Sequence, residues 1–378
     1  MIKELPSEPW AEWVKRIILH VPDYLSYVGE PTSGGRQRKV RDIARIIRER
    51  MQIPCVILQK GVSDWKTKDA DGTPVIGLNA GLRVSGDPEF GWRTRSFLRP
   101  GDAIIYMGGE DAWPFFVKGA KAYHVGVWWD GPNSSMAKWA TGIRTQALFQ
   151  ACRSIACCDT NVINWLRTRD RKHQDSANEA VYIPNCVDLS SLNVSERMRP
   201  STPLKIVFAR RFEMKRGPFL MLDTARKLAD ASFEFELLMS SAEGHDGSDT
   251  IRDEARKRGI ERHVKTAVNN LNSVYSVYRD ADVSVVPTLW SEGTSYTAVE
   301  SIAAGLPVVT TTVGGLPNLV VPGFNGYVCP PQPASIAEAI LRYRDHTLWQ
   351  RHHRNCLSMR EAFSVEAWRD RVMDWLAS

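Results

Sequence analysis

The sequence predicts an α/β fold with two domains. The chain has 378 residues, which is long enough for two domains that each bury a sizeable core. Asp282–Pro287 is a short β-branched run closed by proline, a pattern typical of a buried strand. A helix-length segment follows it, Gly305 and Pro307 end that helix, and Val308–Thr310 starts another strand. Strands and helices that alternate in this way form open α/β sheets.

Residues 1–190 are expected to form the first domain. Arg16–Pro22 has the apolar character of an opening strand. Pro31–Lys39 is a glycine-containing loop that leads into a helix at Val40–Met51. Two further parallel strands are expected at Ile104–Tyr106 and Tyr123–Trp128.

The second half is divided by its composition. Residues 191–203 are rich in serine, proline and charge and are expected to be a linker. Residues 204–358 are the expected second domain, which Leu204–Phe208 opens as a strand. The last segment, 359–378, is expected to contain an amphipathic helix that Ser364 caps. The buried face of this helix is predicted to contain Trp368, Val372 and Trp375.

A pair of glutamates brackets the start of the helix after the predicted strand. Glu292 and Glu300 lie eight positions apart, and at about 1.5 Å rise per residue this interval spans roughly 12 Å. That length matches the reach from a sugar ring, across a diphosphate, to a ribose. Ligands bind at the carboxyl ends of strands in open α/β sheets. Backbone N–H groups and the positive end of the helix dipole therefore predict a phosphate site at Gly293, Thr294 and Ser295.

Motifs around and after this pair resemble those of glycosyltransferase family four. Besides the two glutamates, the chain contains Gly305-Leu-Pro-Val-Val309, Val313-Gly-Gly-Leu-Pro317 and Gly323-Phe-Asn-Gly-Tyr-Val328. The resemblance covers roughly residues 203–345. It implies the GT-B fold, in which two Rossmann-like domains face each other across a cleft and a C-terminal helix crosses back to the first domain. It also implies an enzyme that retains anomeric configuration and uses a nucleotide-sugar donor without a metal.

A cationic segment follows the strand that opens the second domain. The family has Gly-Arg-Leu at this point, and Lys-Gly five positions after the arginine. In Ala209–Gly217 that interval places Arg211 on the family's arginine and Arg216 on its lysine. Both cations are expected to neutralise a leaving diphosphate. Lys215 is a rival one position away, and a slipped register would bring Lys215 or Arg210 to the site.

The resemblance also implies roles for these residues. Glu300 is expected to bind the ribose of the donor, and Glu292 is expected to position the sugar rather than to form a covalent bond. No protein nucleophile is expected, because in this family the acceptor hydroxyl attacks from the face of the leaving group and the departing phosphate takes its proton. Cations and helix N–H groups aimed at the β-phosphate stabilise the negative charge that grows there.

Two features of the first half match the family's donor site in position. Gly34 and Gly35 match a Gly-Gly loop near the first strand, although an ordinary turn has the same signature. Many relatives have a histidine after the strand predicted at Tyr123–Trp128, and Asp130 lies there in this chain. Asp130 is the expected substitute for the sugar contact of that histidine. His124 lies inside the strand and is expected to be a satisfied core residue.

Positive charge and tryptophan are concentrated in the first half. Up to residue 190 there are about 26 Lys and Arg against about 21 Asp and Glu, together with nine of the thirteen tryptophans. A basic and aromatic surface suits an anionic membrane that carries a lipid-linked acceptor. It equally suits stacking on sugars or contact with a nucleic-acid strand. Core tryptophans beneath a solvated basic face would give the same composition.

No cofactor and no metal are expected beyond the nucleotide sugar as co-substrate. The seven cysteines are scattered, which predicts neither a disulfide framework nor a zinc site and favours a reduced, cytosolic setting. Asp69-Ala-Asp71 and Asp280-Ala-Asp282 imitate a metal-binding Asp-x-Asp, but the first lies in a turn-like segment and the second leads into a buried strand. No stretch of about 18 apolar residues and no signal-peptide pattern occurs. The expected location is the cytoplasm, including the inner face of the membrane as a peripheral protein.

These inferences predict a retaining glycosyltransferase. The expected reaction moves a hexose-type sugar from a nucleoside-diphosphate sugar to the hydroxyl of a glycan or lipid-linked acceptor, in bacterial surface polysaccharide or glycolipid assembly. Three alternatives stay open: a glycosyltransferase acting on modified nucleic-acid bases, a sugar-nucleotide epimerase on the same fold, and an inactive sensor that binds the donor. Salt-sensitive DNA retention would favour the first, and sugar release unaffected by any acceptor would favour the second.

Overall fold

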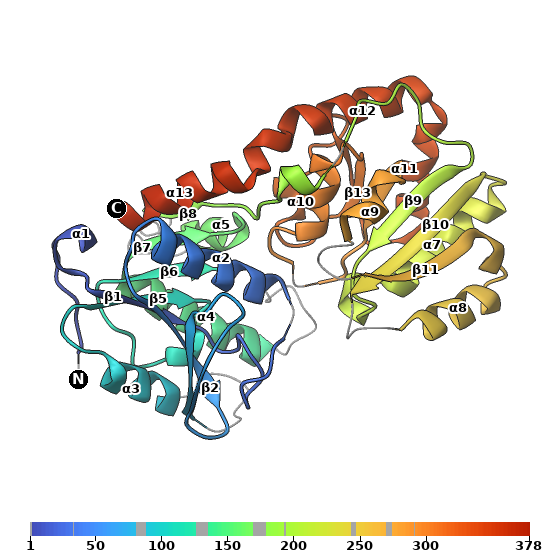
Figure 1. The fold of residues 1–378 in the computed structure, drawn as a ribbon. Coiled ribbons are helices and arrows are strands. Elements are labelled where there is room, and N and C mark those ends of the chain that lie inside the picture. The colour runs from blue at the N-terminus through green and yellow to red at the C-terminus, as the bar shows by residue number, and fades with distance from the viewer. Residues whose placement is uncertain are drawn as a thin grey trace. The chain divides into compact units, whose positions relative to one another are not determined.

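The protein consists of two compact units in the computed structural model, which describes residues 2–32, 34–80, 88–125, 135–168, 179–192, 194–242, 247–269, 274–290 and 292–378 (Figure 1). Unit 1 comprises the described residues up to Ile183 together with Arg369–Ser378. Unit 2 runs from Pro184 to Trp368. Each unit contains one sheet that is parallel or almost entirely parallel, so the α/β class predicted from the sequence is confirmed.

Unit 1 is built on an eight-stranded sheet in the order β3-β4-β2-β1-β5-β6-β7-β8. Only the edge pair of β3 and β4 is antiparallel. The sheet is formed by β1 Arg16–His20, β2 Cys55–Gly61, β3 Trp65–Lys68, β4 Pro74–Asn79, β5 Asp102–Met107, β6 Ala120–His124, β7 Cys152–Cys157 and β8 Val181–Tyr182. Its helices are α1 Trp10–Trp13, α2 Gly35–Glu49, α3 Pro88–Phe97, α4 Ser135–Ala151 and α5 Asn161–Arg167. The long central strands are buried along nearly their whole length, which explains why they read as continuous apolar runs.

Unit 2 is built on a six-stranded parallel sheet in the order β11-β10-β9-β12-β13-β14. Its strands are β9 Leu204–Ala209, β10 Phe235–Ala242, β11 Val264–Asn269, β12 Val283–Val286, β13 Val308–Thr311 and β14 Gly326–Cys329. The helices are α7 Pro218–Asp230, α8 Ser248–Lys257, α9 Val274–Arg279, α10 Tyr296–Ala303, α11 Pro333–Leu341 and α12 His346–Met359. The strand order reverses between β9 and β12, because the strands that follow each of them are laid down on opposite sides.

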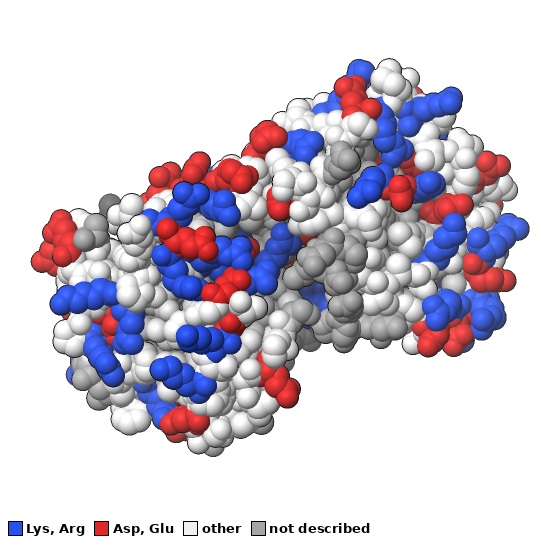
Figure 2. Space-filling view, in the orientation of Figure 1, with Lys and Arg blue, Asp and Glu red and all other residues white. Residues whose placement is uncertain are grey.

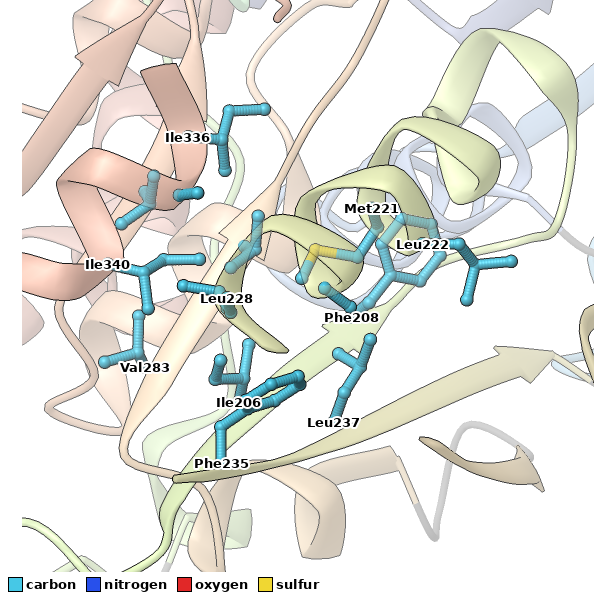
Figure 3. Packing of buried hydrophobic residues seen from close by; sticks show 14 of the residues in the cluster. Ile206, Phe208, Met221, Leu222, Leu228, Phe235, Leu237, Val283, Ile336 and Ile340 are labelled. Atoms are coloured by element: carbon cyan, nitrogen blue, oxygen red, sulfur yellow. The ribbon is translucent and has the colours of Figure 1, made fainter. Parts of the chain in front are cut away.

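Apolar side chains from the strands and helices of unit 2 form its core. Ile206 and Phe208 of β9 lie against Met221 and Leu228 of α7 (Figure 3). Ile340 of α11 belongs to the same cluster, and each of these five side chains is at most 1% exposed. At about 25 cal/mol per Å² of buried apolar surface, such side chains each contribute on the order of 2 kcal/mol. This core fixes β9, and therefore fixes the loop that follows it.

The last helix of the chain, α13 (Val365–Ala377), ends in unit 1 although it follows unit 2 in sequence. Ser364 caps it, since its Oγ accepts a hydrogen bond of 3.1 Å from the N–H of Ala367. Trp368 and Trp375 are 1% exposed and Val372 is fully buried, as the spacing predicted. The returning helix implied by the family resemblance is therefore confirmed.

The change from unit 1 to unit 2 falls ahead of the predicted linker at 191–203. Ile183 is tied to unit 1, because its carbonyl accepts a hydrogen bond of 2.7 Å from the hydroxyl of Tyr123. Asn185 is tied to unit 2 through a hydrogen bond to the carbonyl of Thr294. The serine-rich and proline-rich segment is thus part of unit 2, and it runs along the amino end of β9.

Basic side chains gather over α2 on the face of the molecule drawn in Figure 2, where acidic residues are interleaved with them. Arg45 lies 2.8 Å from Asp71, and Arg36 pairs with Asp23. The positive excess of the first half is therefore partly neutralised on this helix. Among the described residues, no helix is long and apolar enough to cross a membrane.

Candidate active site

The reversal of strand order in unit 2 brings two loops together at the carboxyl ends of β9 and β12. In doubly wound sheets this switch point is where ligands bind. A hydrogen bond joins the loop after β12 to the loop after β9, since the N–H of Leu289 donates to the carbonyl of Lys215 at 2.9 Å. Gly217 has φ +76°, and a Cβ there would lie 2.0 Å from the carbonyl oxygen of Pro287. Glycine is therefore required at this contact, for both its backbone angle and its lack of a side chain.

Glu292 is the centre of the cluster that these loops create. Its side chain is 8% exposed, and its Oε2 lies 2.6 Å from Nη1 of Arg216. Arg210 pairs with the same oxygen through Nη2, and the hydroxyl of Thr288 donates to it at 2.9 Å. All three bonds end on Oε2, and among the residues described no donor is bonded to Oε1. One carboxylate oxygen thus anchors the group.

The charge state of the cluster follows from competition between burial and ion pairing. Burial acts to raise the pKa of Glu292, but Arg210 and Arg216 outweigh it, so that the pKa is lowered. Burial lowers the pKa of Arg210, and Glu292 opposes that effect. The carboxylate therefore stays ionised at neutral pH between two guanidinium groups.

Of the two cations that the sequence predicted at the site, Arg216 lies beside Glu292 and Arg211 does not. Arg211, expected beside the diphosphate, instead pairs with Glu213 at 2.8 Å, and its side chain is 30% exposed. Lys215 pairs with the same glutamate at 3.1 Å. Arg210 occupies the position beside Glu292, because it is the first residue after β9 and its guanidinium lies buried at the switch point. Arg216 therefore lies beside Glu292 as predicted, Arg210 lies where Arg211 was expected, and the rival Lys215 lies away from Glu292.

The predicted phosphate site is the turn that leads into α10. Ser295 is the N-cap of this helix, and its side chain accepts from the N–H of Ala298 at 3.4 Å. The Thr294 side chain is 3% exposed, and its hydroxyl has no hydrogen-bond partner among the described residues. A buried hydroxyl without a partner is unusual, because leaving it unsatisfied costs free energy. The turn therefore carries an unused polar group beside a helix start.

A loop after β13 holds the backbone of Glu292 from the other side. Gly315 N–H donates to the carbonyl of Glu292 at 3.1 Å. Gly314 has φ +57°, and a Cβ there would lie 1.8 Å from that same carbonyl oxygen. The Val-Gly-Gly-Leu-Pro motif thus positions the glutamate through a close backbone contact.

Glu300 lies on α10 and is 5% exposed. The hydroxyl of Tyr278, on α9, donates to its Oε2 at 2.9 Å. Only Tyr296 onwards is helical, so the 12 Å estimated for the whole interval from Glu292 to Glu300 does not apply to a single helix. The structure places the two glutamates at the two ends of one turn-and-helix segment, each held by a partner from another element.

The predicted site residues of the first half lie in unit 1. Gly34 precedes α2 with extended backbone angles, and Gly35 is the first residue of that helix. Asp130 lies outside the described residues. His124 is 2% exposed at the end of β6, with its Nε2 3.4 Å from Oε1 of Glu110, which agrees with a satisfied core histidine.

Three partners in the cluster were not predicted from the sequence. Thr288 is the first residue after the predicted strand ending at Pro287, and this place at a strand end could have marked it as a site residue. Tyr278 and Asn185 come from segments that are distant in sequence from the residues they contact. In the second Asp-x-Asp segment, the carboxylate of Asp282 pairs with Arg197. It also accepts a hydrogen bond of 2.8 Å from the N–H of Lys205. The described residues contain no group of three His, Cys, Asp or Glu side chains arranged to hold a metal.

Residues 193–354 match the family model for glycosyl transferases group 1. Within the same half, the chain is 27% identical over 166 residues to a phosphatidyl-myo-inositol mannosyltransferase of Mycobacterium tuberculosis. This alignment covers 43% of the present chain and 43% of that relative. The chain therefore matches less than half of the length of this relative.

Solved structures are similar over nearly the whole chain. A sucrose-phosphate synthase from Thermosynechococcus elongatus has a TM-score of 0.75 and 18% identity, covering 95% of this chain and 98% of that one. Anabaena HepE in complex with UDP-glucose has a TM-score of 0.69 and 14% identity, covering 96% and 99%. The two parallel-sheet units and these neighbours establish the GT-B fold, and the match over residues 193–354 supports a glycosyltransferase.

Proposed function

We propose that the protein is a retaining glycosyltransferase that moves a hexose-type sugar from a nucleoside-diphosphate sugar to an acceptor hydroxyl. The observation that carries the proposal is the cluster of Glu292, Arg210 and Arg216 at the switch point of unit 2, next to the start of α10. Guanidinium groups and helix N–H groups together suit a diphosphate. Glu300, further along the same helix, has the chemistry to bind a ribose diol.

The two arginines differ in burial, and we propose a different role for each of them. The Arg210 side chain is 6% exposed and holds Glu292 and Thr288, so it is a positioning residue. The Arg216 side chain is 16% exposed and is the cation that we assign to the diphosphate. As the bond to the sugar breaks, negative charge grows on the leaving phosphate, and a cation already in place stabilises it without reorganisation.

Glu292 is assigned to the sugar rather than to covalent catalysis. Its Oε2 is bonded to Arg210, Arg216 and Thr288, which leaves Oε1 to accept a sugar hydroxyl. A carboxylate whose pKa is lowered by two arginines is also a weak base. We propose that the acceptor hydroxyl attacks from the face of the leaving group, that its proton passes to the departing phosphate, and that no metal is needed.

The proposed setting is glycolipid or surface polysaccharide assembly. A mannosyltransferase acting on phosphatidyl-myo-inositol is among the relatives of the C-terminal region, which supports a lipid-linked or glycan acceptor. A structural neighbour holds UDP-glucose, which supports a nucleotide-sugar donor. Contact with an anionic membrane through the basic face of unit 1 stays a prediction.

A panel of uridine and guanosine diphosphate sugars tests the donor. A tight donor raises the melting temperature, and transfer is then assayed with glycan and lipid acceptors in the presence of EDTA. Inversion of the anomeric centre, or a complete loss of transfer in EDTA, would contradict the mechanism. Conversion of the donor that no acceptor changes would indicate an epimerase instead.

Variants of the cluster test the roles. Arg216→Gln is expected to lower kcat about 100-fold or more, as removal of one preorganised donor does elsewhere. Glu300→Gln is expected to raise the donor KM about tenfold with a smaller effect on kcat, because it weakens ribose binding. Arg226→Gln removes an exposed arginine paired with Asp230 in the same unit and should leave both constants unchanged. If Arg211→Gln were inactive and Arg216→Gln fully active, the assignment of Arg216 to the diphosphate would be wrong.

A further inference from the structure

The structure contains a cationic pocket at the amino end of the unit 2 sheet, away from the candidate active site. It has a volume of about 360 Å³ and is lined by Arg197, Arg199, Pro200, Ser201, Lys205, Arg279 and Asp280. Lys205 lies near the start of β9, whereas Arg210 directly follows its end. At about 3.3 Å per residue, the stretch between them spans roughly 16 Å. A donor held by Arg210 and Arg216 therefore does not occupy this pocket.

Arg197 is a lining residue of the pocket whose guanidinium is bound to other groups of the protein. Its Nη1 donates to the carbonyl of Ala281 at 2.8 Å, its Nη2 pairs with Asp282, and its guanidinium lies 5.2 Å from the ring centroid of Trp349. These contacts fasten the serine-rich and proline-rich segment to the amino end of β12. They also explain Asp280-Ala-Asp282: Asp282 is a buried anchor for this segment rather than a metal ligand.

The other three cations of the pocket differ from Arg197 in their ion pairing. Within the described part of the chain, no ion pair joins Arg199, Lys205 or Arg279 to a carboxylate, and the side chains of Arg199 and Arg279 are exposed. The acidic groups beside them are Asp280 in the lining, Asp282 behind it and Glu236, which is the neighbour of Lys205 on β10 and pairs with Lys265 at 2.9 Å. With the Glu236–Lys265 pair neutral in sum, the four cations of the pocket against Asp280 and Asp282 leave a local charge of +2. Like charges brought this close repel one another unless an anion joins them.

We propose that this pocket binds a phosphate dianion, either free or as a phosphomonoester. Its charge complements the local excess of +2. Guanidinium groups bind phosphate with two parallel hydrogen bonds, and the ammonium of Lys205 and the hydroxyl of Ser201 provide further donors. A volume of about 360 Å³ exceeds the needs of an inorganic ion and lies within the range of small-molecule sites, so there is room for an organic group on the phosphate. The proposal does not depend on the function proposed above.

Thermal-shift titration with inorganic phosphate at constant ionic strength tests the site. Wild type is expected to show a saturable rise in melting temperature. Arg199→Gln/Arg279→Gln should bind phosphate at least about tenfold more weakly, since charged hydrogen bonds are lost. The matched control is Arg256→Gln/Lys257→Gln, which removes two side chains that are both 70% exposed in the same unit and should retain the response. Equal binding by the pocket variant, or equal weakening in the matched control, would overturn the proposal.

Two further experiments distinguish the pocket from the donor site, and a lipid headgroup from a free phosphate compound. Arg216→Gln should keep the phosphate response, because that cation belongs to the donor site; loss of the response there instead would overturn the pocket. Nucleoside diphosphate binding measured on the pocket variant should be unchanged, so that failure of the donor site and failure of the pocket are distinguishable. Retention on phosphatidic acid vesicles that the pocket variant loses would identify a lipid headgroup as the source. Binding of free phosphate without such retention would identify a free metabolite.

Discussion

At the scale of single residues, the site depends on which of two adjacent arginines lies inside. Arg210 is buried against Glu292 and Thr288, whereas Arg211 is partly exposed beside Glu213. Both residues are arginines and adjacent in the chain. Only the position of the residue relative to the end of β9 distinguishes the buried ion pair from the surface one. The free energies of the two pairs should differ accordingly.

Arg210→Gln is expected to lower the free energy of unfolding by about 3 kcal/mol, because it removes one partner of a buried carboxylate. Arg211→Gln removes the same charge from a partly exposed pair and should change that free energy by less than about 1 kcal/mol. Urea denaturation of the two variants measures the difference. Equal losses would mean that the assignment of the buried arginine is incorrect.

At the scale of elements, the site is assembled by close contacts between loops that follow different strands. Gly217 allows the loop after β9 to meet the carbonyl of Pro287, and Gly314 allows the loop after β13 to meet the carbonyl of Glu292. The sheet brings the three loops to one edge, and the glycines allow them to touch. The motif Val-Gly-Gly-Leu-Pro therefore acts on the site through its backbone rather than through a side chain.

Gly314→Ala tests this contact, and Gly323→Ala is its matched control. Both glycines have positive φ, at +57° and +76°, so both substitutions carry a backbone cost of about 1–2 kcal/mol. A Cβ at Gly323 meets nothing within 4 Å, whereas one at Gly314 lies 1.8 Å from the oxygen of Glu292. Gly314→Ala should therefore be destabilised by about 2 kcal/mol more, as overpacked sites are, and should also lose donor binding. Thermal denaturation and donor titration measure both effects, and similar behaviour of the two variants would contradict the steric argument.

At the scale of the whole molecule, a buried lysine holds both chain ends on the unit 1 sheet. Lys121 of β6 is fully buried, and its Nζ donates to the carbonyl of Trp375 at 2.7 Å. Its ammonium lies 5.1 Å from the ring centroid of Trp10 and 5.8 Å from that of Trp375. The first and last helices are thus joined through one cation between two indoles, a cation–π arrangement.

Burial, together with the charge of Arg153, lowers the pKa of Lys121 to about 8. The unfolded chain, with an ordinary pKa near 10.4, then binds more protons than the folded protein between about pH 8 and pH 10.4. The free energy of unfolding is therefore expected to rise across this window, by at most about 1.4 kcal/mol per pH unit. Denaturation curves at several pH values, compared with Lys121→Met, isolate this contribution from other titrating groups. A difference between the two proteins that does not change with pH would contradict the predicted shift.

Much of the fold could be predicted because it depends on local patterns. The β-branched runs at β9 and β12 form strands, and the spacing of Trp368, Val372 and Trp375 produces the buried face of α13. The GT-B fold implied by the family motifs is also confirmed. The sequence predicted the end of the first domain at residue 190, whereas unit 1 ends at Ile183. Composition gives no sign of the hydrogen bond from Tyr123 that holds Ile183 in unit 1.

The sequence by itself determined two α/β units, a final amphipathic helix, the stretch that contains Glu292 and Glu300, and the cationic segment that contains Arg216. Only the tertiary structure decided that Arg210 joins them, that Tyr278 holds Glu300, and that the linker forms a cationic pocket at the other end of the sheet. The physical reason is that periodicity and propensity act between near neighbours in the chain. Which side chain after a strand becomes buried is decided by contacts between loops that are far apart in sequence.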